Sequence, residues 1–358
     1  MLNNNELVLN ENLQNLVDEL DLPESKYELA VKRYETIGEY LGNDKSSLSA
    51  FNPKIYSQGS FRLGTIVKPY KSDEYDIDLV CELELEKNIG QKKLYDLLGT
   101  RLQENEQYRK ILESKRRCWR LEYANEFHMD ILPAIPDLAE DNNSILIPDN
   151  ELKTWHHSNP KDYVDWFYQQ MLPVREALIK EARAEIEKVP FYKYKTPLQR
   201  VIQILKRHRD ILFEKDLDDK PVSIIITTLA SKAYRNEPNL YEALLNIIDR
   251  IPNQFDSLNG QVAVLNPVNS KENFADKWDK YPERKTKFLN WIHGLSCSLS
   301  EVLKLNKKEL YIEKMGTLFG TDTFSKIASK QDKMLQEHFG VTKVSPLIII
   351  EPSKPWEN

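Results

Sequence analysis

Two neighbouring stretches decide the fold: "SQGSFRLGT", residues 57–65, and "YDIDLV", residues 75–80. In the second stretch polar and apolar residues alternate, which predicts a β-strand. Asp76 and Asp78 then lie side by side on one exposed face, while their apolar neighbours face the core. Two adjacent carboxylates repel each other unless a cation bridges them. The strand therefore predicts a cation site.

A second predicted strand, "FHMDIL" at residues 127–132, shows the same alternation of apolar and polar residues. Its apolar residues face the core, and Asp130 projects to the opposite face beside His128. If the two strands are neighbours, three aspartates converge. Three carboxylates can hold two Mg²⁺ or Mn²⁺ ions about 4 Å apart, the arrangement that serves in-line nucleotidyl transfer. Oxygen ligands favour these ions over zinc.

The first stretch has the composition of a phosphate-binding turn. Gly59 and Ser60 are expected to enter a short helix whose free backbone N–H groups bind the terminal phosphates. Gly59 is required because a side chain would hold the phosphate away, and Thr65 braces the loop. Together with the aspartates this predicts a triphosphate site. The alternative is that the aspartates are ordinary surface carboxylates on an amphipathic sheet.

The pattern along the chain predicts the α/β (α+β) class. Helical spacing fills residues 13–20 and 27–42, and residues 53–136 carry alternating strands, a helix at 94–102 and a hairpin through Asn125. A mixed-sheet N-lobe with N-terminal helices, residues 1–150, is expected to pack on a helical C-lobe, residues 151–358. A ligand site is expected in the cleft between them.

The expected helices of the second lobe cover residues 160–171, 196–210, 221–234, 240–249 and 274–295. Thr196 and Gln199 have the spacing of a capping box, and Pro197 stands at the favoured first position.

Charge and hydropathy exclude some classes of protein. The net charge is −6 at pH 7, whereas proteins that bind nucleic acid constitutively usually carry a basic excess. The densest basic cluster, "SKRRCWR" at residues 114–120, is either a solvated strand edge or a wall that neutralises triphosphates. No stretch approaches the ~20 apolar residues that span a bilayer. We expect no membrane and no constitutive nucleic-acid partner.

Cysteine usage predicts a cytoplasmic protein, and the histidines are too few and too scattered to form a zinc-ribbon cluster with the cysteines. Cys81, Cys118 and Cys297 form no CxxC pair, fit a reducing cytoplasm, and are expected to be buried as small hydrophobes. The start "MLNNNELVLN" has no secretory pattern. His156 and His157 are adjacent and poorly placed to share one metal, so we expect them in a loop.

The motifs "GSFRLGT…DEYDIDLV…HMDILPAIP" resemble the catalytic core of the cGAS/DncV-like nucleotidyltransferases (CD-NTases). The segments "SILIPDNELKTWHHSNP" and "NPVNSKENFADKW" are also similar, so the resemblance covers most of the chain. It implies a nucleotidyltransferase fold of the DNA polymerase β-like superfamily, with the active site between the lobes. It also implies the synthesis of cyclic oligonucleotides for anti-phage (CBASS-type) signalling.

The resemblance assigns roles to particular residues. Gly59 and Ser60 would bind the triphosphate, Asp76 and Asp78 would bind two metal ions, and Asp130 would join the ion that activates the acceptor hydroxyl. Lys206 and Ser223 occupy positions from which related enzymes grip the phosphates. For Lys206 a solvated lysine is an equal alternative. No zinc-ribbon cluster is present, so DNA activation is unsupported.

The leading hypothesis is a Mg²⁺- or Mn²⁺-dependent synthase that joins NTPs, ATP among them, into a cyclic di- or trinucleotide and releases pyrophosphate. An effector protein would then recognise the product. Two alternatives stay open. One is a linear oligoadenylate synthase or an RNA-end nucleotidyltransferase, and the other is a catalytically silent nucleotide-binding scaffold.

Overall fold

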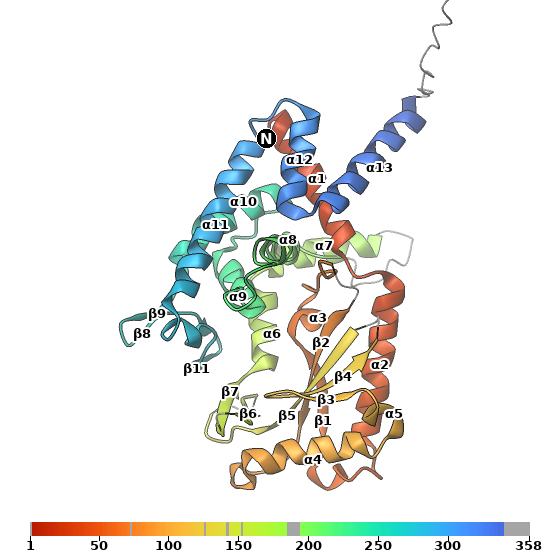
Figure 1. The fold of residues 1–358 in the computed structure, drawn as a ribbon, viewed down its shortest axis with the longest axis vertical. Coiled ribbons are helices and arrows are strands. Elements are labelled where there is room, and N and C mark those ends of the chain that lie inside the picture. The colour runs from red at the N-terminus through yellow and green to blue at the C-terminus, as the bar shows by residue number, and fades with distance from the viewer. Residues whose placement is uncertain are drawn as a thin grey trace, which may run out of the picture.

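The computed structural model describes residues 2–71, 74–124, 127–140, 143–151, 153–184 and 194–339. The strands of one mixed sheet occupy one half of the molecule, and most helices occupy the other (Figure 1). The predicted α/β class, with a mixed sheet and a helical lobe, is confirmed. None of the described helices has both the length and the apolar character needed to cross a membrane.

Seven strands form the main sheet: β1 (Lys54–Gln58), β2 (Tyr75–Glu82), β3 (Leu112–Ser114), β4 (Trp119–Tyr123), β5 (Phe127–Pro136), β6 (Ile145–Asp149) and β7 (Thr154–Ser158). Their order is β1-β2-β5-β4-β3, β6 pairs with β5, and β7 pairs with β6. β2 and β5 run parallel, and the other pairs are antiparallel. The expected turn at Asn125 lies outside the described residues. His156 and His157 lie on β7, so their assignment to a loop is wrong.

The alternating strands bury their apolar face against α2 (Glu24–Gly42) and α4 (Gln91–Gln103). Ile77, Met129 and Ile131 belong to this core. Short helices α3 (Gly59–Leu63) and α5 (Glu106–Arg109) complete this part of the chain.

A second core joins the helices α1 (Asn4–Leu20), α6 (Pro160–Gln169), α8 (Pro197–Leu212), α9 (Ser223–Ala233), α10 (Leu240–Arg250), α11 (Pro282–Val302), α12 (Lys308–Phe319) and α13 (Thr321–Phe339). Helix α7 (Leu172–Ala184) follows α6. The N-terminal helix α1 thus packs among helices from the far end of the chain, as Figure 1 shows at its top. The division of the chain at residue 150 stays a prediction.

Two further expectations are wrong, one about the second lobe and one about the cysteines. The helix expected over 274–295 begins only at Pro282, after short strands that include β10 (Leu265–Asn266) and β11 (Asn269–Asn273). The side chain of Asn273 accepts hydrogen bonds from the backbone of Val264 and Ala275, which holds this region in a turn. A further hairpin pairs β8 (Asp256–Leu258) with β9 (Gln261–Ala263).

The second error concerns the cysteines. Only Cys81 is buried; Cys118 is partly buried and Cys297 is exposed. Cys297 lies on the side of α11 opposite the residues that face the core, among them Trp291 and Leu295.

Candidate active site

The turn after β1 places Gly59 directly against the carboxylate of Asp78. Gly59 begins α3 with a φ of 65°, in the left-handed region that favours glycine. A Cβ added there would lie 2.2 Å from Oδ2 of Asp78. Asp78 pairs with Gln58 across β1 and β2, which explains this close approach. The carboxylate therefore requires glycine at this position, a reason that the sequence did not reveal.

The expectation that the two aspartate-bearing strands are neighbours is confirmed. On the parallel pair β2–β5, Asp78 stands opposite Asp130 and Asp76 stands opposite His128. The alternation of each strand turns all four side chains to one face. Asp76 is exposed, as expected, whereas Asp78 is partly buried. The expectation that both side chains lie on an exposed face is therefore wrong for Asp78.

Burial, and after it the negative charges of Asp130 and Asp76, raise the pKa of Asp78 to about 7. Lys206 and Arg120 act in the opposite direction. A carboxyl whose charge is disfavoured by its like-charged neighbours is a group that a bound cation would stabilise.

Arg120 supplies positive charge at this face. Its guanidinium donates to both oxygens of Asp130, from Nε at 2.6 Å and from Nη2 at 2.8 Å. Nη2 also lies 3.8 Å from Oδ1 of Asp76. Across the part of the chain that the structure describes, no three acidic, histidine or cysteine side chains surround one ion position. In this conformation Asp130 is bound to Arg120.

The role of Arg120 was missed, although a signal was available. Asn125 lies midway between Arg120 and Asp130, so a hairpin that turns there pairs them across β4 and β5. The structure shows this register. Nearby, Arg116 and Arg117 each donate from Nε to the fully buried Asp149, at 2.9 Å. These two residues neither form a freely solvated edge nor line the cavity described below.

Lys206 is buried, with only 5% of its surface exposed, so the solvated alternative is wrong. Its Nζ donates to the carbonyl oxygen of Thr65 at 3.0 Å and to the Thr65 hydroxyl at 3.2 Å. Thr65 in turn donates its backbone N–H to the carbonyl of Ser60 at 2.9 Å. Burial, followed by the charge of Arg209, lowers the pKa of Lys206 to about 7.

A cavity of ≈ 490 Å³ opens between the sheet and the helices. Of the residues predicted for the site, it is lined by Ser60, Asp76, Lys206 and Ser223. Gly59, Asp78 and Asp130 lie immediately behind this lining, through the contacts described above. Arg120, Arg209 and Lys220 add positive charge to the walls.

Helix α9 begins at Ser223, whose hydroxyl accepts a hydrogen bond from Nη1 of Arg209 at 2.9 Å. Asp210 accepts from Lys220 at 2.7 Å. The sequence did not single out these three charged residues. For Arg209 and Asp210 the reason is that nothing in the run "KRHRD", residues 206–210, distinguishes a cavity wall from a solvated helix face.

Comparison with known proteins identifies the family of this chain. Residues 7–170 match the Second Messenger Oligonucleotide or Dinucleotide Synthetase domain. The chain is 32% identical to a c-di-GMP synthase of Roseivirga ehrenbergii, over 93% of this chain and 89% of the relative. The chain belongs to the CD-NTase family. It is accordingly a nucleotidyltransferase, as the sequence predicted.

Other CD-NTases agree. The cyclic dinucleotide synthase CdnG of Bradyrhizobium diazoefficiens is 28% identical over 80% of this chain and 74% of the relative. Its structure in complex with GTP shares the fold with a TM-score of 0.74, at 24% identity, covering 90% of this chain and 99% of that one. A structure of Escherichia coli DncV bound to 3′-deoxy GTP gives a TM-score of 0.62, at 17% identity, over 86% of this chain and 94% of that one.

CD-NTases generally use divalent metal ions, and three residues of this face have the donor chemistry for such ions, although in this conformation the described side chains do not surround one ion position. Asp76, Asp78 and Asp130 supply oxygen donors on one face of adjacent strands, which is the ligand chemistry of Mg²⁺ and Mn²⁺. Burial, and after it the charges of Asp130 and Asp76, raise the pKa of Asp78, and a bound divalent ion would favour the charged form of this carboxyl.

Proposed function

We propose that the protein joins two NTPs into a cyclic dinucleotide and releases one pyrophosphate for each linkage. The observation that carries the proposal is the register of Asp78 and Asp130 on parallel strands, with the Gly59 turn packed against Asp78. This arrangement sets a phosphate-binding turn beside a set of carboxylates at the edge of a cavity whose walls include Arg120, Lys206 and Arg209. The 32% identical relative is named a c-di-GMP synthase, which supports a cyclic product.

In the proposed reaction the backbone N–H groups at Gly59 and Ser60 hold the terminal phosphates. The side chain of Gln58 makes no capping hydrogen bond to α3, which leaves these donors to a ligand. Lys206 and Ser223 face the same cavity from the helical lobe and would neutralise and orient the triphosphate. By holding the triphosphate, these groups would orient the α-phosphorus in line with the attacking hydroxyl.

Each linkage forms when a ribose hydroxyl oxygen attacks the α-phosphorus of an NTP. The bond from that phosphorus to the bridging oxygen breaks, pyrophosphate leaves, and the hydroxyl proton passes to water. A second attack by the other nucleotide closes the ring. Two Mg²⁺ or Mn²⁺ ions held by Asp76, Asp78 and Asp130 would supply hydroxyl activation and neutralise the phosphate charge.

GTP is the first substrate to test. One relative is named for c-di-GMP, and the structure of another was determined with GTP. ATP remains a candidate second substrate. We further propose that the product is a second messenger in anti-phage signalling, made in the cytoplasm and recognised by a separate effector protein.

The test incubates the protein with GTP, ATP and their mixture, each radiolabelled at the α-phosphate, with Mg²⁺ or Mn²⁺. The Asp76→Asn, Asp78→Asn double variant serves as the inactive control. A labelled product that forms only with the unaltered protein, together with released pyrophosphate, supports the proposal. A protein that binds NTPs but releases no pyrophosphate would instead be a silent nucleotide-binding scaffold.

A further inference from the structure

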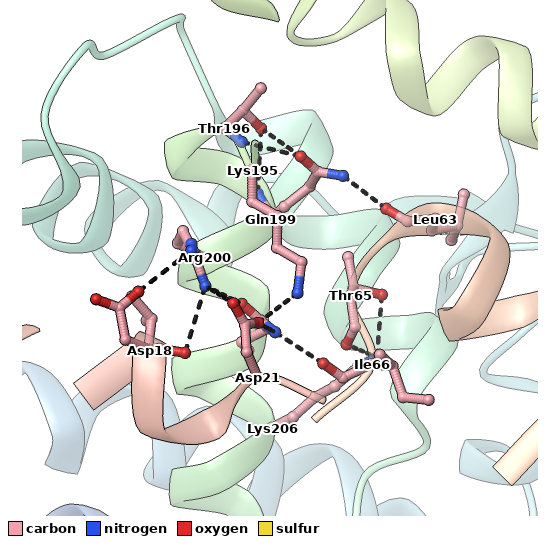
Figure 2. A network of polar contacts seen from close by, with 12 residues as sticks. Asp18, Asp21, Leu63, Thr65, Ile66, Lys195, Thr196, Gln199, Arg200 and Lys206 are labelled. Carbon is pink, nitrogen blue, oxygen red and sulfur yellow. Dashed lines mark hydrogen bonds and ion pairs between the residues drawn. The ribbon is translucent and has the colours of Figure 1, made fainter. Parts of the chain in front are cut away.

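Helix α8 holds the chain segment that leads from the phosphate-binding turn toward β2. Gln199 donates from Nε2 to the carbonyl of Leu63 at 2.9 Å, and Gln203 donates from Nε2 to the carbonyl of Ile66 at 2.7 Å. Figure 2 shows the amide of Gln199 reaching from the helix toward Leu63. Because the two glutamines are one helical turn apart, they lie on the same face of α8.

The oxygen and the nitrogen of the Gln199 amide make hydrogen bonds to two different segments. Its oxygen accepts the backbone N–H of Thr196 at 2.9 Å, which completes the capping box at the start of α8. Its nitrogen serves only the carbonyl of Leu63 among the described contacts. A Cβ on Gly64 would lie 2.6 Å from that nitrogen, so the two segments are in close contact. The oxygen thus stabilises the helix, and the nitrogen holds the loop.

Gln203 is fixed from two sides. It is fully buried, and its Nε2 also donates to Oδ1 of Asp21 at 2.8 Å. Asp21 directly follows α1 and accepts a hydrogen bond from Arg200 at 2.6 Å and another from Lys195. The hydrogen bonds to Asp21 and to Ile66 leave Gln203 little freedom to move, and Figure 2 shows Asp21 held by Lys195 and Arg200.

We propose that Gln199 and Gln203 are positioning residues for the nucleotide, an inference that rests on the proposed function. Neither lines the cavity, so neither touches the NTP. They fix the segment at residues 63–66, and this segment bonds to both sides of the phosphate site. Thr65 contacts Ser60 through its backbone and Lys206 through its carbonyl and hydroxyl. Losing either amide would let the turn and the lysine move apart.

The division of tasks in Gln199 provides a sharp test. Gln199→Glu keeps the acceptor for Thr196, since glutamate also completes a capping box, but it loses the donor to Leu63. Thr196→Ala does the reverse, because it removes the hydroxyl that caps α8 and leaves the amide of Gln199 in place. Gln199→Met and Gln203→Met remove the donors without adding charge, which excludes simple repulsion of the phosphates.

The probes are the α,β-methylene analogues of GTP and ATP with Mg²⁺, with affinities measured by calorimetry well below each variant's melting temperature. We expect the affinity to fall about tenfold in Gln199→Glu, Gln199→Met and Gln203→Met, a change on the scale of one net hydrogen bond. Thr196→Ala should lower the melting temperature and leave the affinity within about twofold. In turnover, KM should rise while kcat changes little, because the turn binds ground and transition states alike.

The inference is overturned if the glutamine variants lower the melting temperature but keep the affinity and KM of the unaltered protein. It is also overturned if Thr196→Ala weakens binding as much as Gln199→Glu does. Failure of the proposed function looks different: the unaltered protein would bind the analogues without forming a cyclic product, and the affinity comparison would still decide the role of the glutamines.

Discussion

Arg120 and Asp130 face each other across β4 and β5, and the guanidinium binds both carboxylate oxygens at 2.6 and 2.8 Å. Both side chains are mostly buried, with 22% and 16% of their surfaces exposed. The positive charge of Arg120 therefore stands within the set of carboxylates that would bind metal ions. It compensates their repulsion in the protein without metal.

Replacing Arg120 should destabilise the metal-free protein. In Arg120→Gln, Asp130 keeps its charge without its partner, and the unfolding free energy at pH 8 should fall by about 1–3 kcal/mol. Mn²⁺ should then raise the melting temperature more in the variant than in the unaltered protein, because the ion relieves more repulsion. Denaturant unfolding and thermal melts with and without Mn²⁺ measure both effects. Equal Mn²⁺ shifts in the two proteins would contradict this interpretation of Arg120.

Asp78→Asn should stabilise the metal-free protein at alkaline pH while it abolishes synthesis. The pKa of Asp78 is raised in the folded state to about 7, from its usual 3.8. The folded protein therefore favours the protonated carboxyl, and this contribution to stability is lost as pH rises from about 4 through 7. The free energy of unfolding of Asp78→Asn should equal that of the unaltered protein near pH 4 and exceed it by at least about 1 kcal/mol at pH 8. Denaturant unfolding at several pH values measures this difference in unfolding free energy. A difference that does not change with pH would contradict the raised pKa of Asp78.

The sequence predicted the parts of the site that depend on local pattern. The strand alternation placed Asp76, Asp78 and Asp130 on one face, and the Thr196–Gln199 spacing predicted the capping box that the structure contains. Both features depend only on the period of a strand or a helix, which a sequence shows directly.

Contacts between distant segments could not be predicted in this way. The nitrogen of Gln199 binds a backbone carbonyl at Leu63, and a backbone carbonyl leaves no mark on the sequence. The reason for Gly59 was likewise hidden, because the clash of an added side chain is with Asp78 on another strand. Lys206 could not be decided between cavity and solvent until the packing of α8 was known.

Gly59→Val should weaken NTP binding more than Ser60→Ala does. Valine at a φ of 65° is strained, and its Cβ would lie 2.2 Å from an oxygen of Asp78, so the turn must shift. Ser60→Ala keeps the backbone N–H groups that grip the phosphates. Affinities for the methylene analogues, measured on folded variants, test the order. The reverse order would mean that the Ser60 hydroxyl provides the grip.

Acid should destabilise the protein partly through His208. The ring of His208 accepts a hydrogen bond from Nε1 of Trp291 at 2.6 Å, and burial lowers its pKa from 6.5 to about 4. Below pH 6.5 the unfolded chain binds a proton that the folded protein does not, so stability falls by up to about 1.4 kcal/mol per pH unit. In His208→Phe this slope between pH 6.5 and 4.5 should become shallower, in denaturant unfolding at each pH. An unchanged slope would show that His208 does not contribute.

The mass of the product after phosphatase treatment tests cyclic synthesis most directly. Unlabelled GTP, ATP or both are incubated with the protein and Mg²⁺ or Mn²⁺, treated with phosphatase, and analysed by mass spectrometry. A cyclic dinucleotide has no terminal phosphate, so it should survive with the mass of two nucleoside monophosphates less two waters. The double variant Asp76→Asn, Asp78→Asn should remain folded and yield none of it. A ladder of linear oligonucleotides that lose their 5′ phosphates to phosphatase would contradict the account and favour a linear synthase.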